Sequence, residues 1–168
     1  MTLSRKILLL GGLLLALWGM SYGLYYALFD EHQTLVRMGE RLTAAFSLAA
    51  EKKMPESSAA LAAYARARYE YVREVDVHSH WSGLALLLIL LGVMFDQVAF
   101  AEGARRWLAV ALVAGSCLFP LGVFLQIFSP GLGPTVIAGG GAGLLVVALA
   151  VVAAGFARST SRGPAPKG

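Results

Sequence analysis

Residues 81–101 read WSGLALLLILLGVMFDQVAFA, and this stretch decides the fold class because Asp96 is its one charged side chain. About 20 helical residues cross a hydrocarbon core of about 30 Å. The chain holds further blocks of this kind: Ile7–Phe29, Trp107–Phe128 and Thr135–Ala157. A helix of a soluble domain is rarely apolar all round over such a length. The sequence therefore predicts an all-α integral membrane protein with four transmembrane helices arranged as a four-helix bundle.

The composition excludes several other classes of protein. Of 168 residues, 58% are hydrophobic and 14% charged, whereas about a quarter of the residues in an average soluble domain are charged. A soluble globular enzyme and a disordered chain are thereby excluded. The single cysteine, Cys117, excludes an intrachain disulfide. The net charge of +4 does not indicate a nucleic-acid partner, because many of the basic residues flank apolar blocks.

Basic residues in short flanks predict the orientation. They lie before the first block, between the second and third, and after the fourth: Arg5, Lys6, Arg105, Arg106, Arg158, Arg162 and Lys167. An even number of spans places these segments on one side, which we expect to be cytoplasmic in a bacterial-type inner (plasma) membrane. The predicted units are residues 1–29 (N-terminus and first span), 30–80 (extracytoplasmic hairpin), 81–157 (three spans) and 158–168 (disordered tail). We expect the first block to be an uncleaved anchor, since no small-residue cleavage site ends it.

The long connection between the first two spans has the pattern of two amphipathic helices. Two sets of residues follow three-four spacing: Leu35, Met38, Leu42, Ala45 or Phe46, and Ala49, then Leu61, Tyr64, Arg68, Tyr71 and Val75. Lys52, Lys53 and Pro55 indicate a helix end followed by a helix start, so we place the turn between Met54 and Pro55. Two helices that pack through such narrow apolar faces bury little surface. The hairpin is therefore expected to need a partner, either another membrane subunit or a second copy.

The hairpin predicts a meeting of the three histidines. A turn between Met54 and Pro55 places His32 opposite His78 and brings His80 to the same depth. Imidazole is a common ligand of haem iron, copper and zinc, and Glu31 and Asp76 are alternative ligands or second-layer hydrogen-bond acceptors. Haem b or a copper or zinc ion are the cofactors that such a set would hold.

The spacing of His78 and His80 limits this prediction. Positions two apart on a continuous helix point about 200° apart, so His32 is expected to pair with one of the two. Two other interpretations stay open. The rings form part of an aromatic belt at the membrane boundary, or they form a proton-responsive site.

Asp96 is predicted to be an intramembrane acid paired with Arg105 or Arg106 across the short loop, because an unpaired charge inside a span is costly. The spacings Gly19-x-x-x-Gly23 and Gly139-x-x-x-Gly143 predict close helix contacts.

The sequence contains no Walker, Ser-His-Asp or paired-carboxylate motif, so it does not indicate an enzyme. The functional prediction is an accessory, assembly or interaction subunit that acts through its outside hairpin. The alternatives are a haem- or metal-binding redox protein that uses His32 with His78 or His80, and an extracytoplasmic sensor module.

Overall fold

The computed structural model describes residues 1–129 and 131–160, and within them every regular element is helical. The α-helices are α1 (Leu3–Phe29), α2 (Glu31–Ala50), α3 (Met54–Met94), α4 (Glu102–Phe128) and α5 (Leu132–Thr160), and a short 3-10 turn, η1 (Phe95–Gln97), follows α3. Helices α1, α3, α4 and α5 are long and apolar enough to span a membrane. The prediction of four such helices is confirmed.

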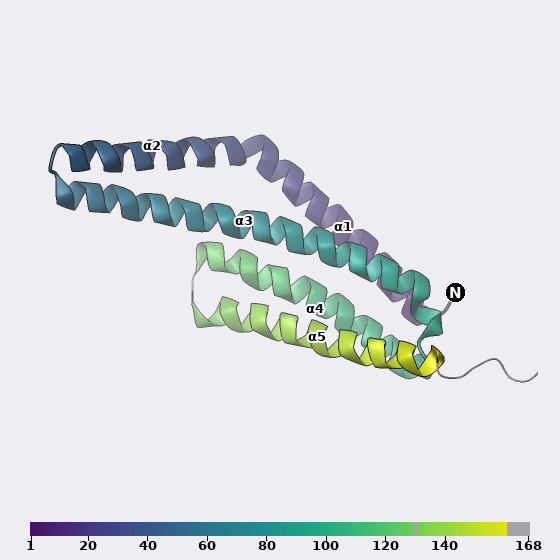
Figure 1. Cartoon of the computed structure of the whole chain (residues 1–168). Coiled ribbons are helices and arrows are strands. Elements are labelled where there is room, and N and C mark those ends of the chain that lie inside the picture. The colour runs from purple at the N-terminus through teal and green to yellow at the C-terminus, as the bar shows by residue number, and fades with distance from the viewer. Residues whose placement is uncertain (130, 161–168) are drawn as a thin grey trace, which may run out of the picture.

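Helix α3 ties the two parts of the molecule together. It runs for 41 residues without interruption, which corresponds to about 60 Å. Its N-terminal half pairs with α2 as an antiparallel hairpin, and its C-terminal half packs against α1 and α4 (Figure 1). The paired α2 and α3 extend beyond the end of α4 and the start of α5.

The turn of the hairpin lies earlier than predicted. Helix α2 ends at Ala50 and α3 begins at Met54, so residues 51–53 form the turn. Lys52 adopts a φ of 60°, and the Lys52 and Lys53 N–H groups donate to the carbonyls of Ala49 and Leu48. This pair of bonds is a Schellman motif, which ends the helix by itself. The sequence pattern at Pro55 marks the first turn of α3 instead.

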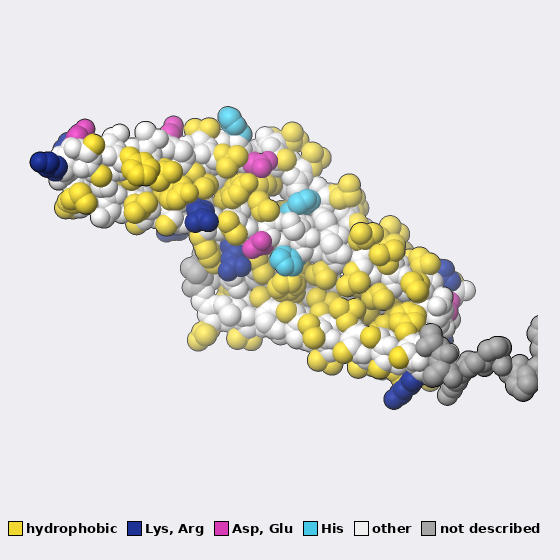
Figure 2. All heavy atoms as spheres, viewed as in Figure 1, with side chains coloured by type: hydrophobic (Ala, Val, Ile, Leu, Met, Phe, Trp, Pro, Cys, Tyr) yellow, Lys and Arg dark blue, Asp and Glu magenta, His cyan; other side chains and the backbone are white. Residues whose placement is uncertain are grey.

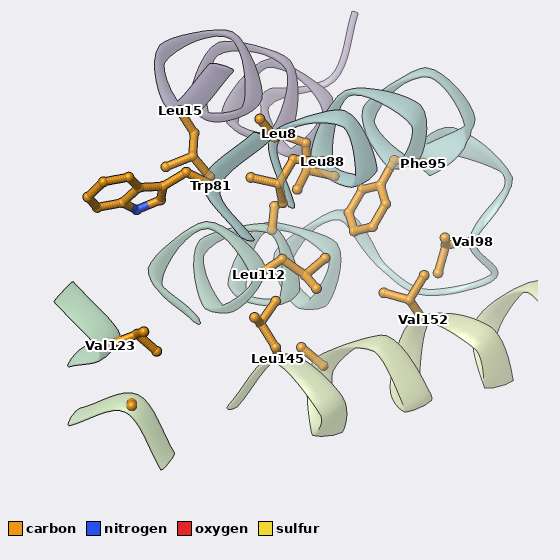
Figure 3. Close-up of a cluster of buried hydrophobic side chains, with 14 of the residues drawn as sticks. Leu8, Leu15, Trp81, Leu88, Phe95, Val98, Leu112, Val123, Leu145 and Val152 are labelled. Atoms are coloured by element: carbon orange, nitrogen blue, oxygen red, sulfur yellow. The ribbon is translucent and has the colours of Figure 1, made fainter. Parts of the chain in front are cut away.

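A continuous apolar core joins the four long helices. Leu8 of α1, Leu88 of α3 and Leu112 of α4 are fully buried, and Figure 3 shows them pointing toward one another. Beyond the end of α3, Phe95 and Val98 turn inward toward Val152 of α5 (Figure 3). The second predicted span ends at Ala101, whereas the helix ends at Met94, because the chain turns at η1 to reach α4.

Glycines set the approach of α4 to α5. A Cβ atom on Gly122 would lie 2.3 Å from the backbone nitrogen of Ala138, and one on Gly141 would lie 2.4 Å from that of Phe119. Gly139 and Gly143 face open space, so the predicted contact through this pair is wrong. The contact glycine of α5 is Gly141, which lies between them in the sequence. Pro120 lies inside α4, which continues through it.

We expect Gly122→Ala to lower the free energy of unfolding by about 1–3 kcal/mol, the range for overpacking a tight contact. The added methyl group meets backbone atoms of α5, which cannot move aside as a flexible side chain can. Thermal unfolding of the detergent-purified protein measures the effect. The matched control is Gly143→Ala, which adds the same methyl group in open space and is expected to leave the unfolding temperature unchanged or to raise it. Equal losses in both variants would contradict this account.

Candidate functional site

The predicted meeting of the three histidines does not occur. The Arg41 guanidinium of α2 donates to the Ala63 carbonyl of α3 at 2.9 Å, and the ring of Tyr26 lies against that of Tyr71. His32 lies between Tyr26 and Arg41 in the sequence. Since these two residues meet Tyr71 and Ala63 of α3, His32 lies level with the segment between Ala63 and Tyr71. That segment ends seven positions before His78, a separation of at least about 10 Å along α3. The early turn shifts the register and causes the difference.

Each histidine has its own surroundings, and the three side chains form separate cyan groups in Figure 2. His32 is exposed on α2. The Nδ1 atom of His78 lies 3.0 Å from the Gly19 carbonyl oxygen of α1. The His80 Nδ1 atom is hydrogen-bonded to the Asp76 carbonyl of the same helix. The His80 ring packs edge-on against that of Phe119 of α4, with the ring centroids 4.6 Å apart. His78 and His80 therefore face different neighbours, as helix geometry predicts.

The alternative ligands do not complete a metal site either. Asp76 pairs with Arg73 of its own helix at 3.9 Å, and Glu31 lies at the start of α2. Over residues 1–129 and 131–160, no group of three or more His, Cys, Asp or Glu side chains is placed to hold a metal ion. Binding of haem, copper or zinc stays a prediction, and these contacts do not support it.

His78 fits into a notch on α1 that two glycines create. A Cβ atom on Gly23 would lie 2.3 Å from the His78 Cε1 atom, and one on Gly19 would lie 3.0 Å from the Trp81 Cβ atom. The spacing Gly19-x-x-x-Gly23 thus forms a close helix contact, as predicted. Because a carbonyl oxygen can only accept a hydrogen bond, the His78 Nδ1 atom must carry a hydrogen, and it donates a hydrogen bond to the Gly19 carbonyl. This histidine joins α1 to α3.

Next to this notch the aromatic side chains of three helices gather. The Trp81 ring of α3 meets Tyr22 and Trp18 of α1, with centroids at 5.4 and 5.8 Å, in edge-to-face geometry. Phe124 of α4 completes the group against Tyr22. Trp18, Trp81 and Phe124 also line an apolar cavity of about 400 Å³ between α1 and α4. These rings form an aromatic packing cluster between α1, α3 and α4.

Asp96 lies in η1, the short 3-10 turn that follows α3. Its carboxylate accepts a hydrogen bond from the Thr2 hydroxyl at 2.7 Å and forms ion pairs with Arg5 at 3.4 Å and Arg105 at 3.7 Å. Of the two arginines predicted as partners, Arg105 makes the contact. Arg5 was missed as a partner because the sequence does not show that α1 starts beside η1.

Glu102 continues this polar network. Its carboxylate accepts bonds from the Ser4 N–H at 3.0 Å and the Ser4 hydroxyl at 3.1 Å and pairs with Arg105 at 3.1 Å. A carboxylate at a helix N-terminus satisfies free N–H groups and complements the helix dipole. The network fastens the starts of α1 and α4 to the end of α3, which is a structural role.

Sequence reasoning missed a titratable group at the junction of α1 and α2. Glu74 lies on α3, N-terminal to the predicted span, and is half-buried. Burial, and next the charge of Asp30, raise the pKa of Glu74 to about 7. Nearby, the Tyr26 hydroxyl is buried without a hydrogen-bond partner in the part of the chain that the structure describes. The available signal was spacing, because Glu74 falls in line with Ala67 and Tyr71 on the face of α3 that meets α2.

Gly23→Ala is expected to lower the free energy of unfolding by about 1–3 kcal/mol, because its methyl group would overlap the His78 ring. The double variant Gly23→Ala/His78→Ala is expected to regain most of the loss, since removal of the ring leaves room. Thermal unfolding of the purified single and double variants measures this coupling. Gly83→Ala, in open space on α3, is the control. Additive losses in the double variant would show that the ring and the glycine do not meet.

Comparisons with protein-family models, with curated proteins and with solved structures found no match for this chain.

Proposed function

We propose that this chain is an accessory or assembly subunit of the bacterial-type plasma membrane that binds another membrane subunit through the helical hairpin outside the membrane. The spans are α1, the C-terminal half of α3, α4 and α5, and both termini are cytoplasmic. Support for the orientation comes from the basic residues near the starts of α1 and α4 and the end of α5: Arg5, Lys6, Arg105, Arg106 and Arg158.

The observation that carries this proposal is the apolar face of the hairpin. Leu61 and Val72 of α3 are 52% and 44% exposed, and Phe46 of α2 is 69% exposed. Figure 2 shows apolar side chains of both helices gathered along one side of the hairpin. A hollow of about 380 Å³ on this face is lined by residues 61, 64, 65, 68, 69 and 72. Contiguous apolar surface outside a lipid phase is typical of a protein-binding site.

The composition of the hollow favours a protein partner. Leu61, Ala65 and Val72 share one face of α3 at helical spacing, as do the anchors of a helix that packs against another protein. Tyr69 and Arg68 add an amphipathic ring and a guanidinium at its edge, both of which are enriched in protein interfaces. A partner that is itself anchored in the membrane meets the hairpin at a high effective concentration, so a modest apolar face is sufficient.

Leu61→Asp is the variant that tests the docking face. Wild-type protein in mildly solubilised native membranes is expected to migrate with a second membrane subunit on a native gel, and Leu61→Asp is expected to migrate alone, because the partner would have to bury an unpaired carboxylate. Ala62→Asp adds the same charge one position along, on an exposed part of α3 outside the hollow, and is expected to leave the complex intact. Wild-type protein that migrates alone would contradict the proposal, and a complex made only of this chain would favour a homo-oligomer.

The orientation has its own test. In a Cys117→Ala background, a membrane-impermeant thiol reagent is expected to label Ser58→Cys in intact cells. Ser159→Cys is expected to react only after the membrane is broken, because it follows the basic residue at the end of α5. Mass shift on a denaturing gel reports labelling. Labelling of Ser159→Cys in intact cells would reverse the proposed orientation.

A further inference from the structure

A polar hollow lies between the hairpin and the C-terminal end of α4. Its volume is about 360 Å³, and it is lined by Arg66, Tyr69 and Glu70 of α3 and by Gln126 and Ile127 of α4. It differs from the docking hollow on the apolar face of the hairpin, which is lined by residues 61, 64, 65, 68, 69 and 72. A guanidinium, a carboxylate and a carboxamide converge here, which suits a ligand with charged groups.

The charged side chains at this hollow alternate in sign along one face of α3. Arg66, Glu70, Arg73 and Asp76 follow three-four spacing. Arg66 pairs with Glu70 at 3.0 Å, and Arg73 pairs with Asp76 at 3.9 Å. Figure 2 shows basic, acidic and histidine side chains close together where α3 runs beside α4. Two positive and two negative charges cancel, so this face complements a ligand that itself carries both signs.

Both guanidinium groups keep donors for a ligand. Within residues 1–129 and 131–160, the Arg66 side chain makes one hydrogen bond, from its Nε–H to the Glu70 carboxylate, and it is 81% exposed. The Arg73 guanidinium lies over the Tyr69 ring, 5.2 Å from the ring centroid, and its 3.9 Å contact with Asp76 is too long for a hydrogen bond. A guanidinium offers two parallel N–H groups to a phosphate, and both of these can do so.

This polar face runs from the end of α4 into the depth of its apolar part. Gln126 lies two residues before the end of α4, and Phe119, which packs against the His80 ring, lies nine residues before it, or about 13 Å. Arg73 and Asp76 lie between these two levels. Helix α4 is about 40 Å long and a hydrocarbon core about 30 Å thick. In a bilayer the hollow therefore lies at the headgroup level, and a lipid headgroup supplies polar partners for charges at this depth.

Below the charges, the same face of α3 becomes open and more apolar. Residues 79, 80, 83 and 84 line a further hollow of about 260 Å³. A Cβ atom on Gly83 would meet nothing within 4 Å, and Gly83 lies one turn beyond His80 in the direction of the span. Charged groups at the headgroup level followed by open space in the span match the order of groups in a phospholipid.

We propose that this face of α3, together with the end of α4, binds one phospholipid whose headgroup carries both a phosphate and a primary ammonium group, as in phosphatidylethanolamine. Arg66 and Arg73 bind the phosphate, and Glu70 accepts a hydrogen bond from the ammonium group. The acyl chains lie along Gly83 and Leu84. The site rests on membrane insertion of the four apolar helices, which is part of the function proposed above, and not on the docking of a partner subunit.

Native mass spectrometry of the released protein tests the site. The chain is reconstituted in nanodiscs with equal amounts of phosphatidylethanolamine, phosphatidylcholine and phosphatidylglycerol, and the lipids that stay bound after release are identified. One phosphatidylethanolamine per chain is expected, because the choline group has no hydrogen-bond donor and the glycerol headgroup has no cation. Equal or stronger retention of either other lipid would overturn the choice of headgroup, and retention of no lipid would overturn the site.

Variants of the charged face identify the binding groups. Arg66→Gln and Arg73→Gln are each expected to lower retained phosphatidylethanolamine about tenfold, because each removes charge-assisted hydrogen bonds to the phosphate. Glu70→Gln is expected to remove the preference over phosphatidylcholine, and a preference that survives would contradict the role of its carboxylate. The matched control is Arg68→Gln, which neutralises a guanidinium of the docking hollow and is expected to keep the lipid. An equal loss in this control would show attraction by surface charge alone and would overturn the site. Thermal unfolding in detergent checks that each variant is folded.

A soluble headgroup separates a lipid site from a site for small phosphate esters. Glycerophosphoethanolamine in large excess carries the same charges without acyl chains, and it is expected to leave the lipid bound. Displacement of the lipid by this compound would overturn the lipid as the occupant. The native-gel test of Leu61→Asp is independent of these measurements, so failure of the lipid site and failure of the docking face are distinguished.

Discussion

The continuity of α3 is the constraint on which the rest of the structure depends. This one helix forms half of the hairpin and also packs against the apolar core. The direction of every side chain from Met54 to Met94 is therefore fixed by a single helical phase. That phase turns Val77, Trp81 and Leu88 inward. It also turns His78 to α1 and His80 to α4. A break in α3 at His78–His80 would have allowed both rings to reach one centre, and the structure has none there.

The long helices could be predicted from composition, but their register could not. Apolar runs of sufficient length identify a helix whatever its neighbours are, because in lipid the backbone must satisfy its own hydrogen bonds. The facing of α2 and α3 depends instead on two single residues. Lys52 ends α2 with a left-handed conformation that is unusual for a lysine, and Asp30 bends the chain between α1 and α2. Neither residue carries a strong local signal, so His32 was placed too close to His78.

The same distinction applies to the candidate sites: contacts between residues near in sequence could be predicted, and contacts that depend on helix packing could not. The ion pair of Asp96 with Arg105 joins residues that are close in sequence, and loop length was sufficient to suggest it. The contacts of Thr2 and Arg5 with Asp96 join the two ends of a long segment, and they depend on how α1 lies against α3. Glu74 was missed for a related reason, because its surroundings combine side chains of three helices. The glycine spacing predicted the contact of α1 with α3 and failed for α5, since Gly139, Gly140 and Gly141 offer three faces to choose from.

The short connection between α3 and α4 has a consequence for the order of assembly. Val98 is 2% exposed, and the Ala99 N–H donates to the Gly155 carbonyl of α5 at 3.2 Å. The connection therefore packs on the last helix of the described chain, although it is made well before that helix. During synthesis from the N-terminus, α1 and α3 can pair while this segment still lacks its cover. The arrival of α5 then closes Phe95 and Val98 into the core, so native packing of the connection is completed by a helix that is synthesised later than α4.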